Sequence, residues 1–593
     1  MGGLLFVTIA AAVLVTLFTG APVAAQLRGH PRGLYVLFGV EMWERFSYYG
    51  LRTLLILYLT RHFLLDDQAA AGLYGGYTTL VYLTPVIGGV LADRVVGARR
   101  AVAFGAVLLV AGHGLMTVEG RPAEQALAYQ GAHYPVRAST GPGASTMPAV
   151  LVGGRLHGLK GLTGGDLAIL GAGPGDPLPA RIKAGSYRFE VVKRDGVAMA
   201  CLYAALALVA LGVGLLKPNV SALVGQLYER HDPRRDSGFT LYYYGINLGS
   251  FWATLLCAAV GETVGWGAGF GLAAIGMTLG LVVFLVGRRW LPPPAPTVAA
   301  TRPGRMGRGL SYLGVLACVP VFWVMLQHSP FIGLLLAAGA VAVLGYLAVY
   351  VQRRCSPAER RNIAIAIVLV LGSVIYFTLE EQGGSSMNLF AARSVQMPAV
   401  HLPWGLSFTV TPGMAQSFQP GFVMIFAPIL AALWTWLEAR GRHVGAGTKF
   451  ALGLAQAGLG FLVLAASGAA HDAGYQVSIL FLALAYLLVS AGELCLSPVG
   501  MAQITRLSPP LLVSTMMSVW FLGTASAEYL GGFVAQAAGA QTVGGLALNP
   551  AAAMAGSVHV FGVLGWIGVG AGVVFWAGAW LAGERFGKRP SAP

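Results

Sequence analysis

The sequence predicts an all-α protein that crosses a membrane many times. Of the 593 residues, 56% are hydrophobic and only 10% are charged, whereas a soluble domain carries about 25% charged residues. Apolar runs long enough to span a bilayer recur along the chain, and such runs are helical because lipid offers no partner to a free backbone N–H or C=O group. The charged residues gather in the short segments between these runs. Together these observations favour a polytopic membrane protein, and we expect no enzymatic activity.

Fourteen apolar runs have the length of a spanning helix. They cover roughly residues 34–60, 69–92, 98–118, 197–222, 239–260, 266–287, 310–327, 330–351, 362–384, 418–438, 447–468, 475–500, 511–537 and 556–582. Six runs precede a Pro- and Arg-rich linker, two follow it, and six more complete the set. This order predicts two six-helix bundles with two extra linker helices between them. The predicted segments are an N-terminal apolar extension (1–30), a first bundle (31–119 and 197–290), an insertion (120–196), a linker with two helices (291–360) and a second bundle (361–593).

Positive charges in the loops favour one orientation of this helix set. Clusters such as Arg94, Arg99 and Arg100 lie on one side, whereas the loops of the other side hold few positive charges, such as Arg61 and Arg393. Cytoplasmic loops carry the excess of Lys and Arg, so both ends of the fourteen-helix unit should be cytoplasmic, in a bacterial inner membrane. The formal net charge of +15 is explained by these loop residues, which set the membrane orientation. The basic residues are not interleaved with aromatics on one domain, as they would be in a nucleic-acid-binding surface. We therefore expect no nucleic-acid partner.

Residues 3–26 form a further apolar run ahead of the fourteen. The run has no positively charged segment before it, although Val23-Ala24-Ala25 resembles a cleavage site. A cleaved signal would place Arg28 and Arg32 outside, against the charge bias of the other loops. An additional N-terminal helix is therefore favoured, and a start site placed too early or a disordered or cleaved extension are the alternatives.

The insertion at residues 120–196 differs from the rest of the chain in composition. It is rich in Gly and Pro, and apolar and polar residues alternate in its later part, over residues 149–154, 167–170 and 185–192. Such alternation between turn signals is typical of strands. We expect a small β-rich module on the extracytoplasmic face, serving as a structural cap or assembly contact rather than as a substrate receptor.

The five cysteines do not indicate a disulfide framework or a zinc site. Four lie in apolar runs, Cys355 lies in a basic loop, and no Cys-x-x-Cys spacing occurs. We expect no metal and no cofactor.

The first of the fourteen runs carries an unusual set of polar groups. At about 100° per residue, five of its side chains share one narrow helical face. They are Glu41, Glu44, Arg45, Tyr48 and Arg52. Each charge at the centre of a membrane helix costs roughly 2.5 to 3.5 kcal/mol on insertion scales, so such groups persist only when they pair or line a polar cavity. This face is therefore expected to look into a wet interior.

The pattern Glu-x-x-Glu-Arg-Phe-x-Tyr-Tyr-Gly over residues 41–50 resembles the first-helix signature of the proton-dependent oligopeptide transporter (POT/PTR) family, bacterial type, within the major facilitator superfamily. Further segments resemble motifs of the same family or superfamily. They cover residues 88–100, 214–220, 232–249, 376–383 and 492–500. The resemblance implies a major facilitator fold and a proton-coupled symporter that imports di- and tripeptides by alternating access, with the peptide at the midplane between the bundles. The proton is then the only coupling ion, and peptides, protons and membrane lipid are the expected partners.

The resemblance also implies a set of proton-coupling residues. They are Glu41, Glu44, Arg45, Lys217 and Glu381. Lys217 is a lone cation in an apolar run and is expected to pair with the cluster on the first helix. Glu381 matches the family acid by position, but Glu380 lies beside it and a swapped role stays open. His113 is a further titratable group in the first half, for which structural packing is favoured over proton transfer.

A second implied set binds the peptide. It comprises Arg52, Tyr48, Tyr49, Tyr82, Lys217, Asn247, Gln419, Glu493, Ser497 and Trp520. Since a dipeptide is a zwitterion, Glu493 suits its ammonium group, and Arg52 and Lys217 suit its carboxylate. Gln419 stands where the family usually has Asn, so its reach is longer. The alternative is a transporter of the same fold for another small solute, such as nitrate or an amino-acid derivative. The acid at position 493 argues against a lone anion, because it would repel it.

Overall fold

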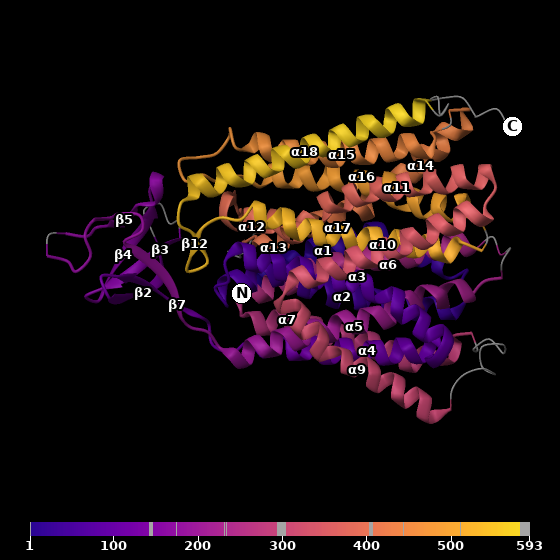
Figure 1. The fold of residues 1–593 in the computed structure, drawn as a ribbon, viewed down its shortest axis with the longest axis horizontal. Coiled ribbons are helices and arrows are strands. Elements are labelled where there is room, and N and C mark those ends of the chain that lie inside the picture. Colours follow the sequence, from indigo (N-terminus) through magenta and orange to yellow (C-terminus); the bar gives the residue numbers. More distant parts are fainter. Residues whose placement is uncertain are drawn as a thin grey trace.

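The structure is a computed structural model of the chain. It describes residues 2–140, 146–173, 175–229, 232, 234–292, 304–401, 407–442, 444–509 and 511–581. Long helices run side by side along the length of the molecule, and a β module projects from one end of the helical bundle (Figure 1).

The helices of the first half form one bundle with a continuous apolar core. They are α2 (Arg32–Arg61), α3 (Asp67–Leu91), continued by the π-helix η1 (Ala92–Val96), α4 (Ala98–Leu115), α5 (Gly196–Gln226), α6 (Arg235–Thr263) and α7 (Trp266–Gly287), with the 3₁₀ turn η4 (Arg288–Trp290) after it. The predicted linker helices follow as α9 (Arg305–Gln327) and α10 (Ser329–Arg354).

The second half forms another bundle with its own core. Its helices are α11 (Pro357–Glu380), the 3₁₀ turn η5 (Glu381–Gly384), α12 (Ser386–Ser394), α13 (Pro412–Ala415), α14 (Phe418–Ala439), α15 (Ala446–Ser467), α16 (Ile479–Leu507), α17 (Val513–Ala537) and α18 (Pro550–Leu581). Short strands connect them at the end of the molecule that carries the β module, namely β8 (Val395–Gln396), β9 (Ala399–His401), β10 (Ser407–Thr409), β11 (Val477–Ser478), β12 (Thr542–Val543) and β13 (Leu546–Ala547).

All fourteen predicted runs are helical in the described part of the chain. Twelve spans there are long and apolar enough to cross a membrane, which establishes a multi-pass membrane protein. Two of the fourteen predicted runs fall outside these twelve spans, namely those that form α2, which carries the charged stripe, and α17. The predicted arrangement of two six-helix bundles with two linker helices is confirmed.

An additional N-terminal helix, α1 (Gly2–Leu27), is present, as the sequence favoured for residues 3–26. It packs against α6, where the Thr19 and Tyr244 hydroxyls lie 2.8 Å apart and the Trp252 indole donates to Thr16 Oγ1 at 3.1 Å. The N-terminus lies toward the end of the bundle that carries the β module (Figure 1).

The insertion contains the predicted strands, arranged as a seven-stranded sheet. The strands are β1 (Glu124–Tyr129), β2 (Ala132–Thr140), β3 (Thr146–Val152), β4 (Arg155–Gly161), β5 (Leu167–Leu170), β6 (Arg181–Ile182) and β7 (Tyr187–Lys193), with the 3₁₀ turn η3 (Thr163–Gly165) between β4 and β5. The spatial order is β6-β5-β4-β3-β2-β1-β7, and every pairing in it is antiparallel. This sheet with its connecting loops is called the β module below.

The β module is inserted into the first bundle but docks on the second. Val543 and Leu548, from the hairpin between α17 and α18, are buried in its apolar core. The backbone N–H of Gly161 donates to the Leu548 carbonyl at 2.9 Å. The Gly544 N–H donates to Gln125 Oε1 at 2.7 Å. The module therefore bridges the two bundles at one end of the molecule.

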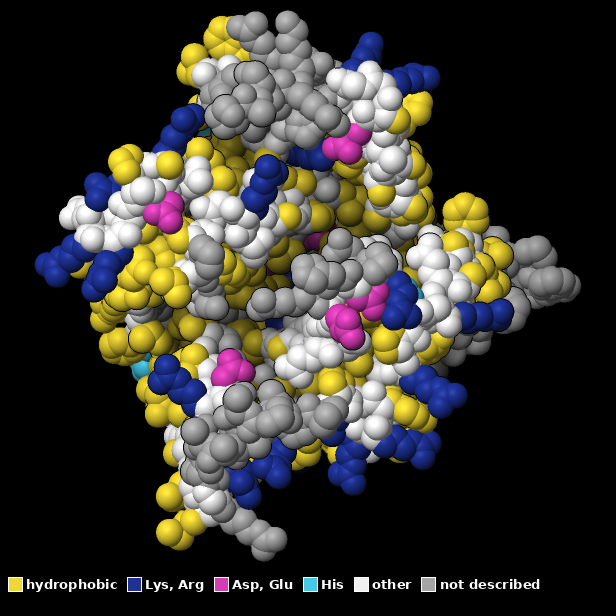
Figure 2. All heavy atoms as spheres, turned by 90° about the vertical axis from the view of Figure 1, so that its right-hand side faces the viewer, with side chains coloured by type: hydrophobic (Ala, Val, Ile, Leu, Met, Phe, Trp, Pro, Cys, Tyr) yellow, Lys and Arg dark blue, Asp and Glu magenta, His cyan; other side chains and the backbone are white. Residues whose placement is uncertain are grey.

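The bundles approach each other closely where α3 crosses α17. A Cβ atom added to Gly75 would lie 2.6 Å from the Cα atom of Gly532, so only glycine fits at this crossing. At the opposite end of the molecule from the β module, the exposed charges are mostly Lys and Arg, and the surface is hollowed toward its middle (Figure 2).

Candidate functional site

The charged stripe of α2 is buried and internally paired. Arg45 Nη2 donates to Glu44 Oε1 at 2.7 Å, and Arg45 Nε lies 3.4 Å from Glu41 Oε1. All three side chains are almost completely buried. Glu41 Oε2 has no hydrogen-bond partner among the described residues. One guanidinium thus serves two carboxyl groups, that of Glu41 at the i,i+4 spacing that favours pairing on a helix and that of the adjacent Glu44.

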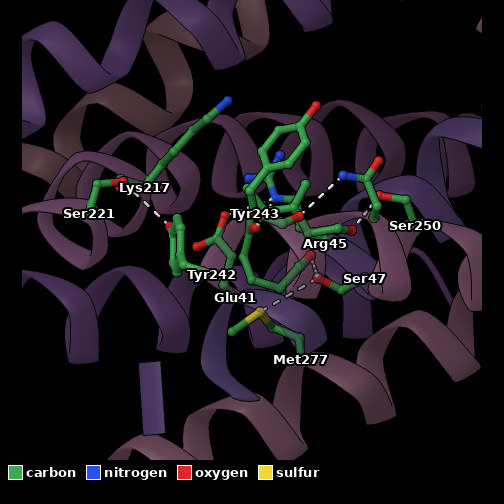
Figure 3. A network of polar contacts seen from close by, with 12 residues as sticks. Glu41, Arg45, Ser47, Lys217, Ser221, Tyr242, Tyr243, Ser250 and Met277 are labelled. Carbon is green, nitrogen blue, oxygen red and sulfur yellow. Dashed lines mark hydrogen bonds and ion pairs between the residues drawn. The ribbon is translucent and has the colours of Figure 1, made fainter. Parts of the chain in front are cut away.

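Lys217 does not pair with this cluster in the present conformation, which corrects the expected contact. Its ammonium lies over the ring of Tyr82, 4.1 Å from the ring centroid. No carboxylate oxygen of the described residues lies within 4.0 Å of the amine. Figure 3 shows the Lys217 side chain extending away from the Glu41 carboxyl group. Arg45 already pairs with both carboxyl groups of the cluster. Lys217 instead makes a cation–π contact with Tyr82, worth about 0.5 to 2 kcal/mol.

Arg52 of the first bundle forms an ion pair with Glu381 of the second. Both side chains are more than nine-tenths buried. Arg52 Nε also donates to the Tyr74 hydroxyl at 2.7 Å. Between the adjacent acids left open by the sequence, Glu381 is therefore the one that meets a cation. Arg52, expected at the peptide carboxylate, is already engaged in this conformation.

A second buried ion pair joins the bundles nearer the β module. Arg393 on α12 contacts Asp67 at the start of α3 with two hydrogen bonds of 2.5 and 2.7 Å. The backbone N–H of Ala540 donates to the same carboxylate at 2.7 Å. Sequence reasoning missed this pair. An acid in the first turn of a helix is readily explained by the helix dipole, and Arg393 was counted only as a loop charge.

Two acids of the second bundle lie close to one another in the interior. The Tyr243 hydroxyl, on α6 of the first bundle, donates to Glu493 Oε1 at 3.0 Å. Gln419 Nε2 donates to Glu380 Oε1 at 2.6 Å. Glu380 and Glu493 are electrostatic neighbours. Glu380 therefore belongs with Glu493, and Tyr243 is a contact that the sequence did not single out from its tyrosine-rich surroundings.

The other predicted peptide-binding residues differ in how much of their surface is exposed. Tyr48 and Trp520 are 1% and 3% exposed, so in this conformation they offer almost no surface to a ligand. Asn247 Nδ2 donates to the Tyr243 carbonyl of its own helix at 3.1 Å. The half-buried side chains, which retain some accessible surface, are Tyr49, Tyr82, Lys217, Gln419, Glu493 and Ser497.

His113 is packed within its helix. It is 1% exposed, and its Nδ1 atom lies 3.0 Å from the Leu109 carbonyl. Within the described residues, no group of three or more His, Cys, Asp and Glu side chains is placed to hold a metal ion.

The contacts between bundles define the conformation. The Arg52–Glu381 and Asp67–Arg393 pairs, and a 2.9 Å hydrogen bond from Asn388 Nδ2 to the Thr53 carbonyl, all lie in the half of the bundle next to the β module. The opposite face is the one hollowed in Figure 2. The interior is thus closed on the β-module side. Glu493 and Lys217, which form no ion pair with another described residue, lie within the bundle.

Comparisons with known proteins agree with this architecture. A sequence profile described as "POT family" matches residues 99–546. The chain is 32% identical over 521 residues to "Uncharacterized transporter YclF" of Bacillus subtilis, covering 86% of this chain and 88% of that protein. It is 30% identical over 521 residues to "Dipeptide and tripeptide permease A" of Erwinia pyrifoliae, covering 87% of each. A crystal structure of a "peptide transporter POT in complex with sulfate" superposes with a TM-score of 0.68 at 30% identity, covering 94% of this chain and 96% of that one.

Proposed function

Because the chain belongs to the POT family of membrane transporters, we propose that it imports di- and tripeptides together with protons by alternating access. One observation of the interior carries the proposal. Glu493 of the second bundle and Lys217 of the first form no ion pair with another described residue, although both lie inside the molecule. Unpaired charges within a membrane are costly and mark ligand sites. An acid on one bundle and an amine on the other match the two ends of a zwitterion.

The peptide is held by its ends and backbone. Glu493 binds the ammonium group, with Glu380 beside it as a second acid. Lys217 binds the carboxylate, and Arg52 joins it once it is released from Glu381. The half-buried Tyr49, Tyr82, Gln419 and Ser497, together with Asn247, supply groups for the peptide backbone. These contacts do not involve the side chains of the peptide. The site is therefore expected to bind the peptide termini and backbone tightly and to accept many different side chains.

Protons act on the ion pairs that hold the bundles together. A proton on Glu381 would cancel its attraction for Arg52, and protons on Glu41 or Glu44 would free Arg45 for other partners. A ligand or proton shifts the equilibrium between two conformations only by its differential affinity for them. Import of a neutral zwitterion with a proton moves net charge, so a membrane potential adds about 2.3 kcal/mol per charge per 100 mV.

The membrane orientation follows from charge. We place the basic face of Figure 2 in the cytoplasm of a bacterial cell and the β module outside the inner membrane. Both ends of the fourteen-helix unit are then cytoplasmic, and α1 carries the N-terminus to the outer side. The module at 120–196 serves as a cap over the closed outer end.

Uptake into proteoliposomes tests the proposal. Labelled dialanine should accumulate when the outside is acidic, and accumulate further when a potassium diffusion potential makes the inside negative. Unlabelled di- and tripeptides should compete, whereas nitrate and free alanine should not. Competition by nitrate or by single amino acids, with none by peptides, would instead support a transporter of another small solute.

A further inference from the structure

Glu528 on α17 is a buried carboxyl group that no function described so far requires. Its side chain is 1% exposed. Neither of its carboxyl oxygens forms an ion pair or a hydrogen bond of regular geometry with a described residue, and the Thr78 hydroxyl is the polar side chain beside them. Arg45, Glu44, Arg52, Glu381 and Asp67 are buried as well, but each of them is paired. Glu528 therefore differs from these fully buried charges of the site.

Its position is at the crossing of the two bundles. Glu528 precedes Gly532 by one helical turn, so both lie on the face of α17 that packs against α3. A Cβ atom added to Gly75 of α3 would lie 3.4 Å from the Glu528 backbone carbonyl. The nearby Thr78 hydroxyl donates to the backbone carbonyls of Tyr74 and Gly75, at 3.2 Å each. The carboxyl group thus lies in the seam that must part when the outer end opens.

Charged and titratable groups face Glu528 from several elements. They are Arg52 and Tyr48 on α2, Tyr74 and Tyr82 on α3, Lys217 on α5, and Glu380 on α11. Arg52, the cation that acts most strongly on Glu528, is already paired with Glu381 and donates to Tyr74. None of these groups therefore neutralises Glu528 by direct contact.

In a buried site without water or a cationic partner, the neutral form of a carboxylic acid is far more stable than the charged carboxylate. A proton on Glu528 would therefore stabilise the outer-closed conformation. When α3 and α17 separate, water reaches the group and the charged form becomes acceptable. The free energy of outer closure thus depends on whether Glu528 holds a proton.

We propose that Glu528 is a proton-binding site of the transport cycle, which locks the outer end shut when occupied. The inference rests on the proposed proton-coupled function. The carboxylate binds a proton from the outside while the seam is open, and the neutral acid allows α3 and α17 to pack. The proton later leaves toward the inner cavity, where the unpaired Lys217 amine and the Tyr82 ring lie. The charge left on Glu528 then destabilises outer closure and returns the empty carrier to the outward-open conformation.

The test uses the full-length protein in proteoliposomes and the variant Glu528→Gln, which mimics the protonated group. An inward pH gradient of one unit supports about tenfold peptide accumulation per coupled proton. Glu528→Gln should therefore lower steady-state accumulation about tenfold, while peptide counterflow, which needs no net proton movement, stays within about twofold of wild type. Ser526→Ala is the matched control, because Ser526 lies on the same helix and donates to the Leu522 carbonyl. Glu528→Asp keeps the carboxyl group and should retain driven accumulation.

Wild-type accumulation by Glu528→Gln would overturn the proposal, as would loss of counterflow in both Glu528 variants, since that marks a purely structural role. An independent readout is infrared spectroscopy of the purified protein at neutral pH. The protonated-carboxyl absorption should lose intensity in Glu528→Gln and not in Ser526→Ala, and an unchanged band would refute a proton on Glu528. If the wild type itself shows no proton-driven uptake, the proposed function fails, and the infrared result still decides whether Glu528 holds a proton.

Discussion

Arg52 on α2 and Glu381 on η5 form a buried ion pair that joins the two halves of the transporter. The pair matters because each partner comes from a different bundle. Removing one partner of a buried pair leaves an uncompensated charge and costs about 3 to 5 kcal/mol, so loss of either charge should destabilise the outer-closed conformation. It is also the point where a proton can act, since neutral Glu381 no longer holds Arg52.

Glu381→Gln should therefore favour the outward-open conformation. We expect acid-driven uptake to be lost and peptide counterflow to persist, because the glutamine side chain copies only the protonated state of the acid. Spin labels at the outer ends of α3 and α17 would measure the change as a longer interspin distance. An unchanged distance distribution in the variant would show that the pair does not hold the outer end closed.

The Asp67–Arg393 pair should act as a second lock on the same end. Asp67→Asn removes the charge but keeps the acceptor for the Ala540 N–H, so the loss reports mainly the ion pair. A double-mutant cycle with Arg393→Gln, read as the outer opening equilibrium, should give a coupling energy of about 0.5 to 3 kcal/mol. Additive effects of the two substitutions would mean that the pair contributes nothing to closure.

Glu44 should be required for coupling but not for binding. Arg45 Nη2 donates to Glu44 at 2.7 Å, and in Glu44→Gln that charge balance is lost permanently. We expect concentrative uptake to be abolished and pH-independent exchange to remain. Parallel uptake and counterflow measurements on the same proteoliposomes test this, and full concentrative uptake by the variant would remove Glu44 from the coupling mechanism.

Glu493 should recognise the amino terminus of the peptide. Loss of a hydrogen bond to a charged group costs about 1.5 to 3 kcal/mol, so Glu493→Gln should raise the KM for dialanine about 10- to 150-fold. N-acetyl-dialanine lacks the ammonium group and should be affected far less. Competition assays with both compounds make the comparison, and an equal effect on the two would place the ammonium site elsewhere.

The sequence reveals those parts of the site in which a charge interrupts an apolar run. Glu41, Glu44 and Arg45 stand out on this ground, and the pairing of Glu41 with Arg45 follows from their i,i+4 spacing. Glu528 is also a lone acid in an apolar run, so the same rule could have found it. Asp67 could not be found in this way, because an acid at a helix start needs no further explanation.

Contacts between distant segments are hidden from a single sequence for a different reason. Turn signals and alternation predict strands in residues 120–196, but nothing local marks Val543 and Leu548 as members of that core. Likewise, Lys217 could be recognised as an interior cation, but its placement over Tyr82 depends on Arg45 having taken both carboxyl groups. Which side chain contacts which partner therefore depends on how distant segments pack together in the folded protein.

The contact between the β module and the second bundle yields the last prediction. Leu548 is 2% exposed in the core that it shares with the module, and truncation of a buried leucine to alanine costs about 2 to 5 kcal/mol. Leu548→Ala should therefore loosen docking of the module, which would appear as faster amide hydrogen exchange in β3 and β4. Because the module projects from one end of the helical bundle, away from the predicted peptide-binding residues, we expect counterflow to stay near the wild-type rate. Leu546→Ala serves as the control, since Leu546 lies on the same hairpin but is only half-buried. A large loss of counterflow in Leu548→Ala with normal exchange protection would instead assign the hairpin a direct part in transport.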